Sequence, residues 1–185
     1  HGRYVEVVSP ADRATWTPTP RPPQTAMGHA PRLSDALLTL LAHPNIASKH
    51  RIIRQYDHEV QGRSVVRPVV GDGGRGPSDA AVVRPVQSSD RGLAIGCGLS
   101  TGWRDDPYVM AIAAVDECVR NLVAVGADPS RVAILDNFCW PSCADPATLG
   151  GLVRAAEGCR DAALAFRTPF IAGKDSLNNQ FATED

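Results

Sequence analysis

The pattern of apolar and polar positions changes character along the chain. Residues 10–31 hold six prolines, which is typical of an extended linker rather than a helix. An apolar helix is predicted at residues 35–42, with Ser34 as its cap, and a second helical stretch at residues 46–60. After residue 63 the pattern alternates between β-branched runs and long apolar helical segments, which predicts a packed domain.

Short β-branched runs predict the first strands of this domain. They occupy residues 64–70, 79–86 and 92–97. Pro68 and Pro85 predict strand ends or edges, because proline cannot donate to a sheet ladder. The glycine-rich segment 71–77 is predicted to be a flexible loop.

Two helices and two more strands follow. Asp106 and Pro107 predict the start of a helix over residues 108–125, which is apolar on most sides and is expected to be deeply buried. A second helix is predicted from Asp145 to about Phe166. The remaining strands are predicted at 131–138 and at 169–173, where the second leads into a polar loop. This order predicts an α/β or α+β domain, with a mixed β-sheet flanked by helices.

Composition narrows the class of protein. The net charge of −1 gives no general attraction to nucleic acid or to a membrane surface, and no apolar run approaches the roughly 20 residues of a membrane span. The five cysteines include no CxxC pair, and Cys139 and Cys143 lack a second Cys/His pair for zinc, so we expect reduced, mostly buried thiols in a cytoplasmic protein. The first residue is not Met, which indicates a cut from a longer chain or a domain boundary.

Three sets of polar residues could carry chemistry. Glu117 and Asn121 lie one turn apart on the apolar helix, and two oxygen ligands at this spacing suit Mg²⁺. A carboxylate bonded to a backbone group or to Arg120 is the structural alternative. Asp79, at the start of a strand, could hold a metal ion that bridges phosphates or could cap a turn.

The segment from Gly173 to Ser176 reads Gly-Lys-Asp-Ser but lacks the upstream glycine of a phosphate loop. It could bind an anion through Lys174 and its backbone, or it could be a solvated turn. His58, near a predicted helix end, is interpreted as structural rather than catalytic.

The order of these motifs resembles one family, phosphoribosylformylglycinamidine synthase, and its second synthase half in particular. The resemblance covers about residues 33–181. It rests on Ser48-Lys49, Gln55–Gly62, Asp79–Val83, Asp116–Ala127, Asn137-Phe138 and Pro169–Ser176.

The resemblance implies an ATP- and Mg²⁺-dependent ligase of purine biosynthesis. Such an enzyme converts formylglycinamide ribonucleotide to the amidine: ATP phosphorylates the amide oxygen, and ammonia from glutamine displaces phosphate. It implies metal ligands at Asp79, Glu117 and Asn121. It also implies nucleotide contacts at Asp136, Gly173 and Lys174, and a substrate contact at Ser176.

Some positions depart from the family pattern. Short forms have Asn where this chain has Lys174, and a charged lysine cannot ligate Mg²⁺. The aspartate of the preceding strand aligns with Ile134 here, although Asp136 lies two residues on. The catalytic histidine region and a glutaminase motif are absent, so this chain is expected to be inactive alone.

The resemblance also implies a fold and partners. The fold is the N-terminal domain of an aminoimidazole-ribonucleotide-synthase-type unit, which pairs through its sheet with a partner half into a barrel. We expect a linker or the end of a preceding domain at 1–32, a helical lead-in at 33–62 and this incomplete domain at 63–185. The expected partners are other domains of the synthase and a glutaminase domain or subunit that supplies ammonia.

Three functional interpretations remain open. The first is a working ATP site, and the second is a non-catalytic module of the same enzyme that holds a structural Mg-nucleotide. The third is another member of the superfamily, such as a hydrogenase-maturation, selenophosphate or thiamine-phosphate enzyme. The run from Tyr56 to Gln61 argues against the third.

Overall fold

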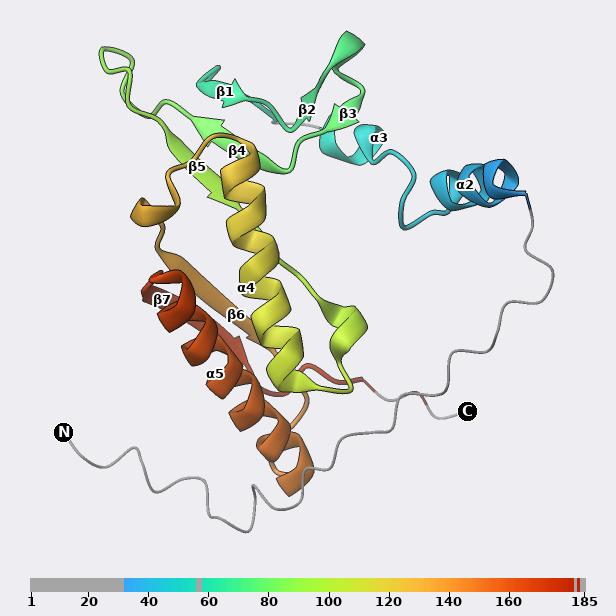
Figure 1. The fold of residues 1–185 in the computed structure, drawn as a ribbon, viewed down its shortest axis with the longest axis vertical. Coiled ribbons are helices and arrows are strands. Elements are labelled where there is room, and N and C mark those ends of the chain that lie inside the picture. The colour runs from blue at the N-terminus through green and yellow to red at the C-terminus, as the bar shows by residue number, and fades with distance from the viewer. Residues whose placement is uncertain (1–31, 56–57, 182, 184–185) are drawn as a thin grey trace. The chain divides into compact units, whose positions relative to one another are not determined.

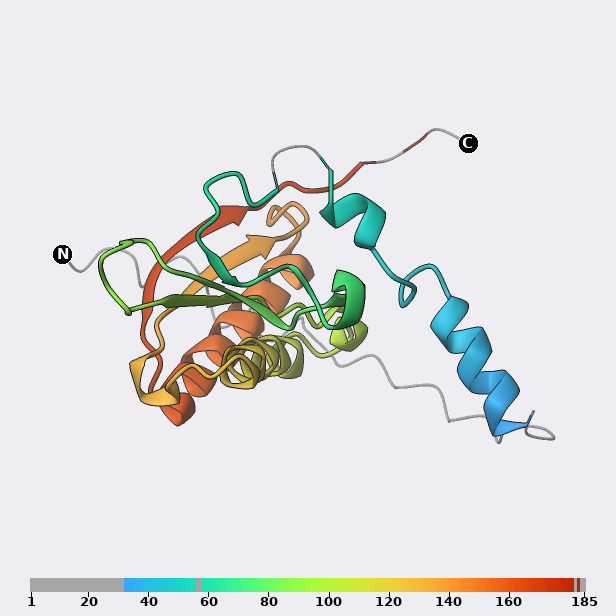
Figure 2. The same cartoon turned by 90° about the horizontal axis from the view of Figure 1, so that it is seen from above.

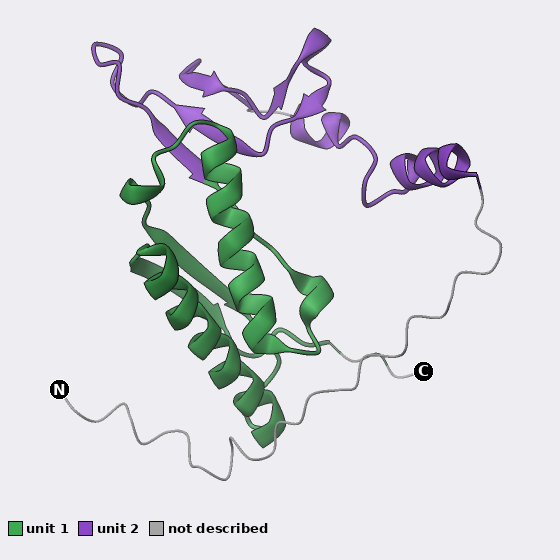
Figure 3. Cartoon of the chain, viewed as in Figure 1, with its two compact units in different colours: residues 1–20, 96–185 green, residues 21–95 purple. Residues whose placement is uncertain are grey.

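The computed structural model describes residues 32–55, 58–181 and 183, and these residues form two compact units (Figures 1 and 3). One unit comprises described residues up to Ile95, and the other begins at Gly96. The proline-rich stretch predicted as a linker lies outside the described residues, as do Tyr56 and Asp57.

The first unit contains short elements. Its helices are α2 (Leu33–Ala42) and α3 (His50–Ile53), and its strands are β1 (Ser64–Val66), β2 (Val69–Val70), β3 (Gly76–Pro77), β4 (Ala80–Val83) and most of β5 (Leu93–Gly96). The strands form a sheet of order β1-β4-β5 and a separate antiparallel β2-β3 hairpin. Strand β1 pairs antiparallel with β4. The apolar face of α2 is exposed, with Leu33 at 89%.

The second unit holds most of the described core. Helix α4 (Pro107–Ala124) packs along α5 (Pro146–Phe166), and both cover one face of the parallel pair β6 (Ile134–Cys139) and β7 (Phe170–Ser176) (Figures 1 and 2). Two 3-10 turns, Thr101–Trp103 and Pro129–Arg131, complete the unit. The buried hydrophobic residues of this unit are Ala111, Val115, Val119, Leu122, Val132, Ile134, Ala155 and Ala162.

Small residues bring the two long helices together. Gly151, Ala155, Gly158 and Ala162 recur at helical spacing along α5 and are all buried. A Cβ atom at Gly158 would collide with the carbonyl oxygen of Tyr108 on α4, so only glycine allows this crossing. Burial of apolar surface along this contact stabilises the unit.

Helix starts match the sequence prediction, because capping is a local interaction. The Asp106 carboxylate accepts from Val109 N at the start of α4, and Asp145 accepts from Thr148 N at the start of α5. Pro107 and Pro146 occupy the first helical positions, where a missing N–H has no cost.

Several predicted boundaries are wrong. Ser34 lies inside α2 and does not cap it, because Arg32 occupies the N-cap position. The helical stretch predicted at 46–60 is reduced to the four residues of α3. The predicted strand at 64–70 is interrupted before Val69, beside Pro68, as the proline indicated. The described strands are also divided among three sheets rather than one mixed sheet.

The predicted burial of α4 is only half right. One face is buried through Ala111, Val115, Val119 and Leu122, but Val123 is 48% exposed. A helix that packs on one side keeps an exposed face even when that face carries apolar residues. The thiols also differ from expectation: all five cysteines are free, but Cys97 and Cys139 are exposed and the other three are half-buried.

Candidate functional site

The polar pair on α4 binds the loop that follows β5. Glu117 Oε2 accepts from the backbone N–H of Leu99 at 2.9 Å, and the Ser100 hydroxyl lies 3.5 Å from the same oxygen. One turn further on, Asn121 Nδ2 donates to the carbonyl oxygen of Cys97 at 2.9 Å. The two side chains therefore fasten the loop from Cys97 to Ser100 onto the helix.

Glycine allows this loop to lie against the helix. A Cβ atom at Gly98 would overlap the carbonyl oxygen of Ala114 and approach Cys118 N to 2.8 Å. Two residues earlier, a Cβ atom at Gly96 would lie 3.0 Å from Leu122 Cγ. The loop backbone thus contacts the α4 backbone directly, and Glu117 and Asn121 supply the polar contacts on either side.

Glu117 was predicted to be buried, but it is exposed. The structural alternative from the sequence, a carboxylate bonded to a backbone group, is confirmed for Oε2. Within the described part of the chain, Glu117 Oε1 and Asn121 Oδ1 accept no hydrogen bond. These two oxygens are a donor set that suits a hard cation such as Mg²⁺.

The third predicted metal ligand lies in the other unit. Asp79 directly precedes β4 and is exposed, whereas Glu117 and Asn121 belong to α4. No group of three or more His, Cys, Asp or Glu side chains gathers as a metal site among the residues described. The metal set of Asp79, Glu117 and Asn121 therefore stays a prediction.

The predicted nucleotide and substrate residues lie on the β6-β7 pair, but they do not share one face. Asp136 is the register partner of Gly173, and Asn137 is the partner of Lys174. Because successive side chains alternate, Asp136 points to one face, and Lys174 and Ser176 point to the other. Lys174 Nζ donates to Ser176 Oγ on that second face. The predicted polar loop is wrong here, since β7 extends to Ser176.

Asp136 requires glycine at its partner position. The position of a Cβ atom at Gly173 is already filled by the Asp136 carboxylate. Burial raises the pKa of Asp136, and a hydrogen bond with Asp175 raises it further. The Asp136 carboxyl group therefore keeps its proton to a higher pH than an isolated aspartate does.

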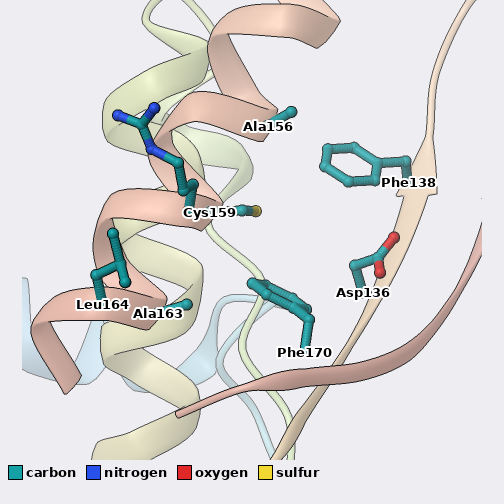
Figure 4. A pocket seen from close by; sticks show the side chains of 8 residues that line it. Asp136, Phe138, Ala156, Cys159, Ala163, Leu164 and Phe170 are labelled. Atoms are coloured by element: carbon teal, nitrogen blue, oxygen red, sulfur yellow. The ribbon is translucent and has the colours of Figure 1, made fainter. Parts of the chain in front are cut away.

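Asp136 faces a cavity of about 350 Å³ between α5 and β6 (Figure 4). Its side chain and that of Phe138 point toward the helix, and the Cys159 side chain points back toward them. Burial raises the pKa of Cys159 to about 11, with a further contribution from Asp136. The thiol is therefore mostly protonated at neutral pH, which disfavours a role as a nucleophile. The other lining residues are Ala156, Arg160, Ala163, Leu164 and Phe170.

Sequence reasoning missed this cavity and the loop that α4 holds. Phe138, Cys159 and Phe170 are far apart in sequence, and no local pattern signals their convergence. The loop had a usable signal: Gly96 ends strand β5 and Gly98 lies two residues further on, and glycine at such positions often marks a close backbone approach.

Glu59 makes the side-chain contacts around His58, which is compatible with the structural interpretation of His58. Glu59 adopts a left-handed backbone with φ of 58°. Its carboxylate lies 3.1 Å from His58 Nε2 and 3.4 Å from Arg67 Nε. These contacts fix the turn that leads into β1.

None of the helices in the described part of the chain combines the length and apolar character that a membrane crossing requires.

Comparison with known proteins identifies the family to which this chain belongs. Residues 77–183, more than half of the chain, match the family described as AIR synthase related protein, N-terminal domain. The chain belongs to this family.

The relatives are more specific. The chain is 40% identical over 153 residues to the phosphoribosylformylglycinamidine synthase subunit PurL of Methanocaldococcus jannaschii, covering 82% of this chain and 20% of that protein. It is 38% identical over 183 residues to the subunit of the same name from Synechococcus sp., covering 89% and 23%. The chain thus spans about a fifth of the length of the curated relatives it matches.

Two solved structures resemble the fold. PurLQS from Thermotoga maritima superimposes with a TM-score of 0.58 and 28% identity, covering 73% of this chain and 21% of that one. Thermotoga maritima PurL complexed with ADP gives a TM-score of 0.58 and 25% identity, covering 84% and 24%.

Proposed function

We propose that this chain supplies part of the nucleotide-binding machinery of a phosphoribosylformylglycinamidine synthase. The observation that carries the proposal is the 40% identity over 82% of the chain to a PurL subunit. The synthase would be a ligase of purine biosynthesis that converts formylglycinamide ribonucleotide to the amidine, with ATP, Mg²⁺ and glutamine-derived ammonia. The Thermotoga relative solved with ADP supports the nucleotide.

The chemistry of the residues fits a Mg-nucleotide. Glu117 Oε1 and Asn121 Oδ1 offer one charged and one neutral oxygen, one helical turn apart, and Asp79 would add a second carboxylate. Mg²⁺, when bound, neutralises phosphate oxygens and requires little covalent chemistry of the protein. The role of this chain is then to hold and orient phosphate groups.

The β6-β7 residues divide between two tasks in this proposal. Lys174 and Ser176, on one face, would contact phosphate and substrate. Gly173 would contact the nucleotide through its backbone. Asp136 lies on the cavity face, where its carboxylate would position Gly173 from behind the strand. Lys174 would act as a cation toward phosphate rather than as a metal ligand.

A second function is favoured by the hydrogen bonds of Glu117. Its Oε2 already holds Leu99, so the acidic site is built into the packing of the fold. A permanently bound Mg-nucleotide there would stabilise the domain by mass action without turnover. This is the non-catalytic module of the same enzyme.

The domain is proposed to begin near residue 63 and to pair with a partner half into a barrel. The strands support this on the face that α4 and α5 leave uncovered, because Leu135 and Ile171 are each 66% exposed. The partner halves, the glutaminase and a cytoplasmic location belong to the same proposal.

The two functions are separated in the assembled synthase by Glu117→Gln, which keeps the size and an acceptor oxygen but removes the charge. In a working site, amidine formation per folded molecule falls at least about tenfold. In a structural site, turnover per folded molecule is unchanged and the melting temperature falls. Asp116→Asn, one residue earlier on α4, is the matched control, because among the described residues Asp116 pairs with surface Arg120 alone. If neither turnover nor melting temperature responds to Glu117→Gln, both functions are wrong at this site.

A further inference from the structure

Two arginines from separate segments converge on the glycine loop that joins β2 to β3. Arg54 follows α3, and Arg75 lies at the end of the loop. Arg54 Nη2 lies 3.1 Å from the position of a Cβ atom at Gly74, and Arg75 Nε lies 3.4 Å from that position at Gly73. The two guanidinium groups therefore border adjacent glycines.

The loop backbone makes room for this arrangement. Gly73 and Gly74 have φ of 64° and 60°, in the left-handed region that favours glycine. Gly71 has φ of 78°. A side chain at Gly73 or Gly74 would be strained and would crowd a guanidinium group, so the loop sequence keeps the space beside both arginines clear.

The described residues neutralise neither arginine. No carboxylate lies within ion-pair distance of Arg54 or Arg75 in the described residues, whereas Arg67, Arg120, Arg154 and Arg160 all have such partners. Asp72 is the one acidic residue of segment 71–77. Both guanidinium groups are exposed and remain available to a ligand.

The net charge of the surrounding residues also favours an anionic ligand. Residues 32–95 contain nine Arg and Lys against six Asp and Glu, a net charge of +3, although the whole chain has a net charge of −1. Segment 49–54 alone contributes Lys49, Arg51 and Arg54 without an acid. Lys49 Nζ donates hydrogen bonds to the carbonyl oxygens of Pro44 and Ala47. No such side-chain hydrogen bond is found for Arg51 or Arg54 in the described part of the chain.

We propose that Arg54, Arg75 and the glycine loop 71–76 form a binding site for a phosphate group. Planar guanidinium groups bind phosphate oxygens through paired N–H donors, and two of them beside an open glycine backbone match a phosphate monoester or a diphosphate. This site uses none of the residues assigned to the Mg-nucleotide, so it stands apart from the proposed function.

The test is titration calorimetry of the whole protein with inorganic pyrophosphate in EDTA, which removes any metal contribution. We expect saturable binding at one site. Arg54→Gln and Arg75→Gln should each weaken binding at least about tenfold. Arg75→Lys should weaken it less, because lysine keeps the positive charge but lacks the paired N–H donors of the guanidinium group. Arg91→Gln, which removes an exposed arginine of the same unit, should change the affinity no more than about twofold.

The same titration with inorganic phosphate and with ribose 5-phosphate identifies the source of the phosphate group. Arginine-dependent binding of any of the three supports the site. Absence of saturable binding of all three overturns it. Equal weakening by Arg54→Gln, Arg75→Gln and Arg91→Gln also overturns it, because that result shows general electrostatic attraction. Binding of heparin that pyrophosphate does not displace shows a polyanion surface instead.

Discussion

The backbone N–H of Leu99 donates to the carboxylate of Glu117 at 2.9 Å, so a residue predicted to bind metal also shapes the loop after β5. Asn121 repeats the arrangement one turn along α4 through the carbonyl oxygen of Cys97. Glu117 Oε2 and Asn121 Nδ2 hold the loop, and Glu117 Oε1 and Asn121 Oδ1 are left for a cation. The structural and metal-binding interpretations of this pair are therefore compatible.

Removing the Glu117 acceptor should loosen the loop. Glu117→Ala leaves Leu99 N without its partner and should lower the free energy of unfolding by about 1 kcal/mol. Glu117→Gln retains an acceptor and should cost less than half as much. Hydrogen exchange at the Leu99 amide, with urea denaturation, measures both effects. Equal protection of Leu99 in the two variants would show that the hydrogen bond is not what orders the loop.

Gly98 should tolerate no side chain. Gly98→Ala places a methyl group on the Ala114 carbonyl oxygen and should destabilise the protein by about 1–3 kcal/mol, as overpacking does. Gly102→Ala is the matched control, because nothing lies within 4 Å of a Cβ atom there. Thermal unfolding of the two variants decides the matter, and similar melting temperatures would mean that the loop does not lie against α4.

Asp136 should make stability depend on pH. Its pKa in the folded protein is raised above the unfolded value, so ionisation opposes folding as pH rises through the folded pKa. Asp136→Asn should therefore stabilise the protein at neutral pH, and the gain should vanish below the unfolded pKa of about 4. Urea midpoints at a series of pH values measure this. A gain that is constant with pH would exclude Asp136 as its cause.

Asp145 is a control with a pKa shift in the opposite direction. Hydrogen bonds from Thr148 lower the pKa of Asp145, so its ionised form stabilises the start of α5. Asp145→Ala should destabilise the protein at neutral pH. The loss should shrink as pH falls through the folded pKa of Asp145.

Thiol reactivity should follow exposure and burial. Because the pKa of Cys159 is raised to about 11, very little thiolate forms at neutral pH, and alkylation by iodoacetamide should be slow. The exposed Cys97 and Cys139 should react faster. Mass spectrometry of timed digests gives each rate, and rapid labelling of Cys159 in the folded protein would contradict its burial beside Asp136.

Structural features that depend on neighbouring residues were predicted correctly from the sequence. Predictions were wrong where contacts with distant segments determine the length of a helix or strand. The starts of α4 and α5 were correct, because Asp106, Asp145 and the prolines act locally. The helix predicted at 46–60 shortened to α3, although its residues suit a helix, and β7 ran on through Lys174 because pairing with β6 extends it.

The candidate site shows the same division. Helical spacing alone put Glu117 and Asn121 on one face, and the structure agrees. The burial of Glu117 could not be inferred from the apolar character of α4, because burial depends on which face of the helix packs against the rest of the unit. Strand register likewise separates Asp136 from Lys174, and a one-residue difference in register would have reversed this result.

The central claim is that Glu117 and Asn121 help to hold a Mg-nucleotide. The most direct measurement is titration calorimetry of ADP into the assembled synthase, with Mg²⁺ and in EDTA, for the parent protein, Glu117→Gln and Asp116→Asn. Our account predicts that Mg²⁺ strengthens ADP binding in the parent and in Asp116→Asn. In Glu117→Gln this enhancement should fall at least about tenfold. An equal Mg²⁺ enhancement in all three proteins would contradict the claim.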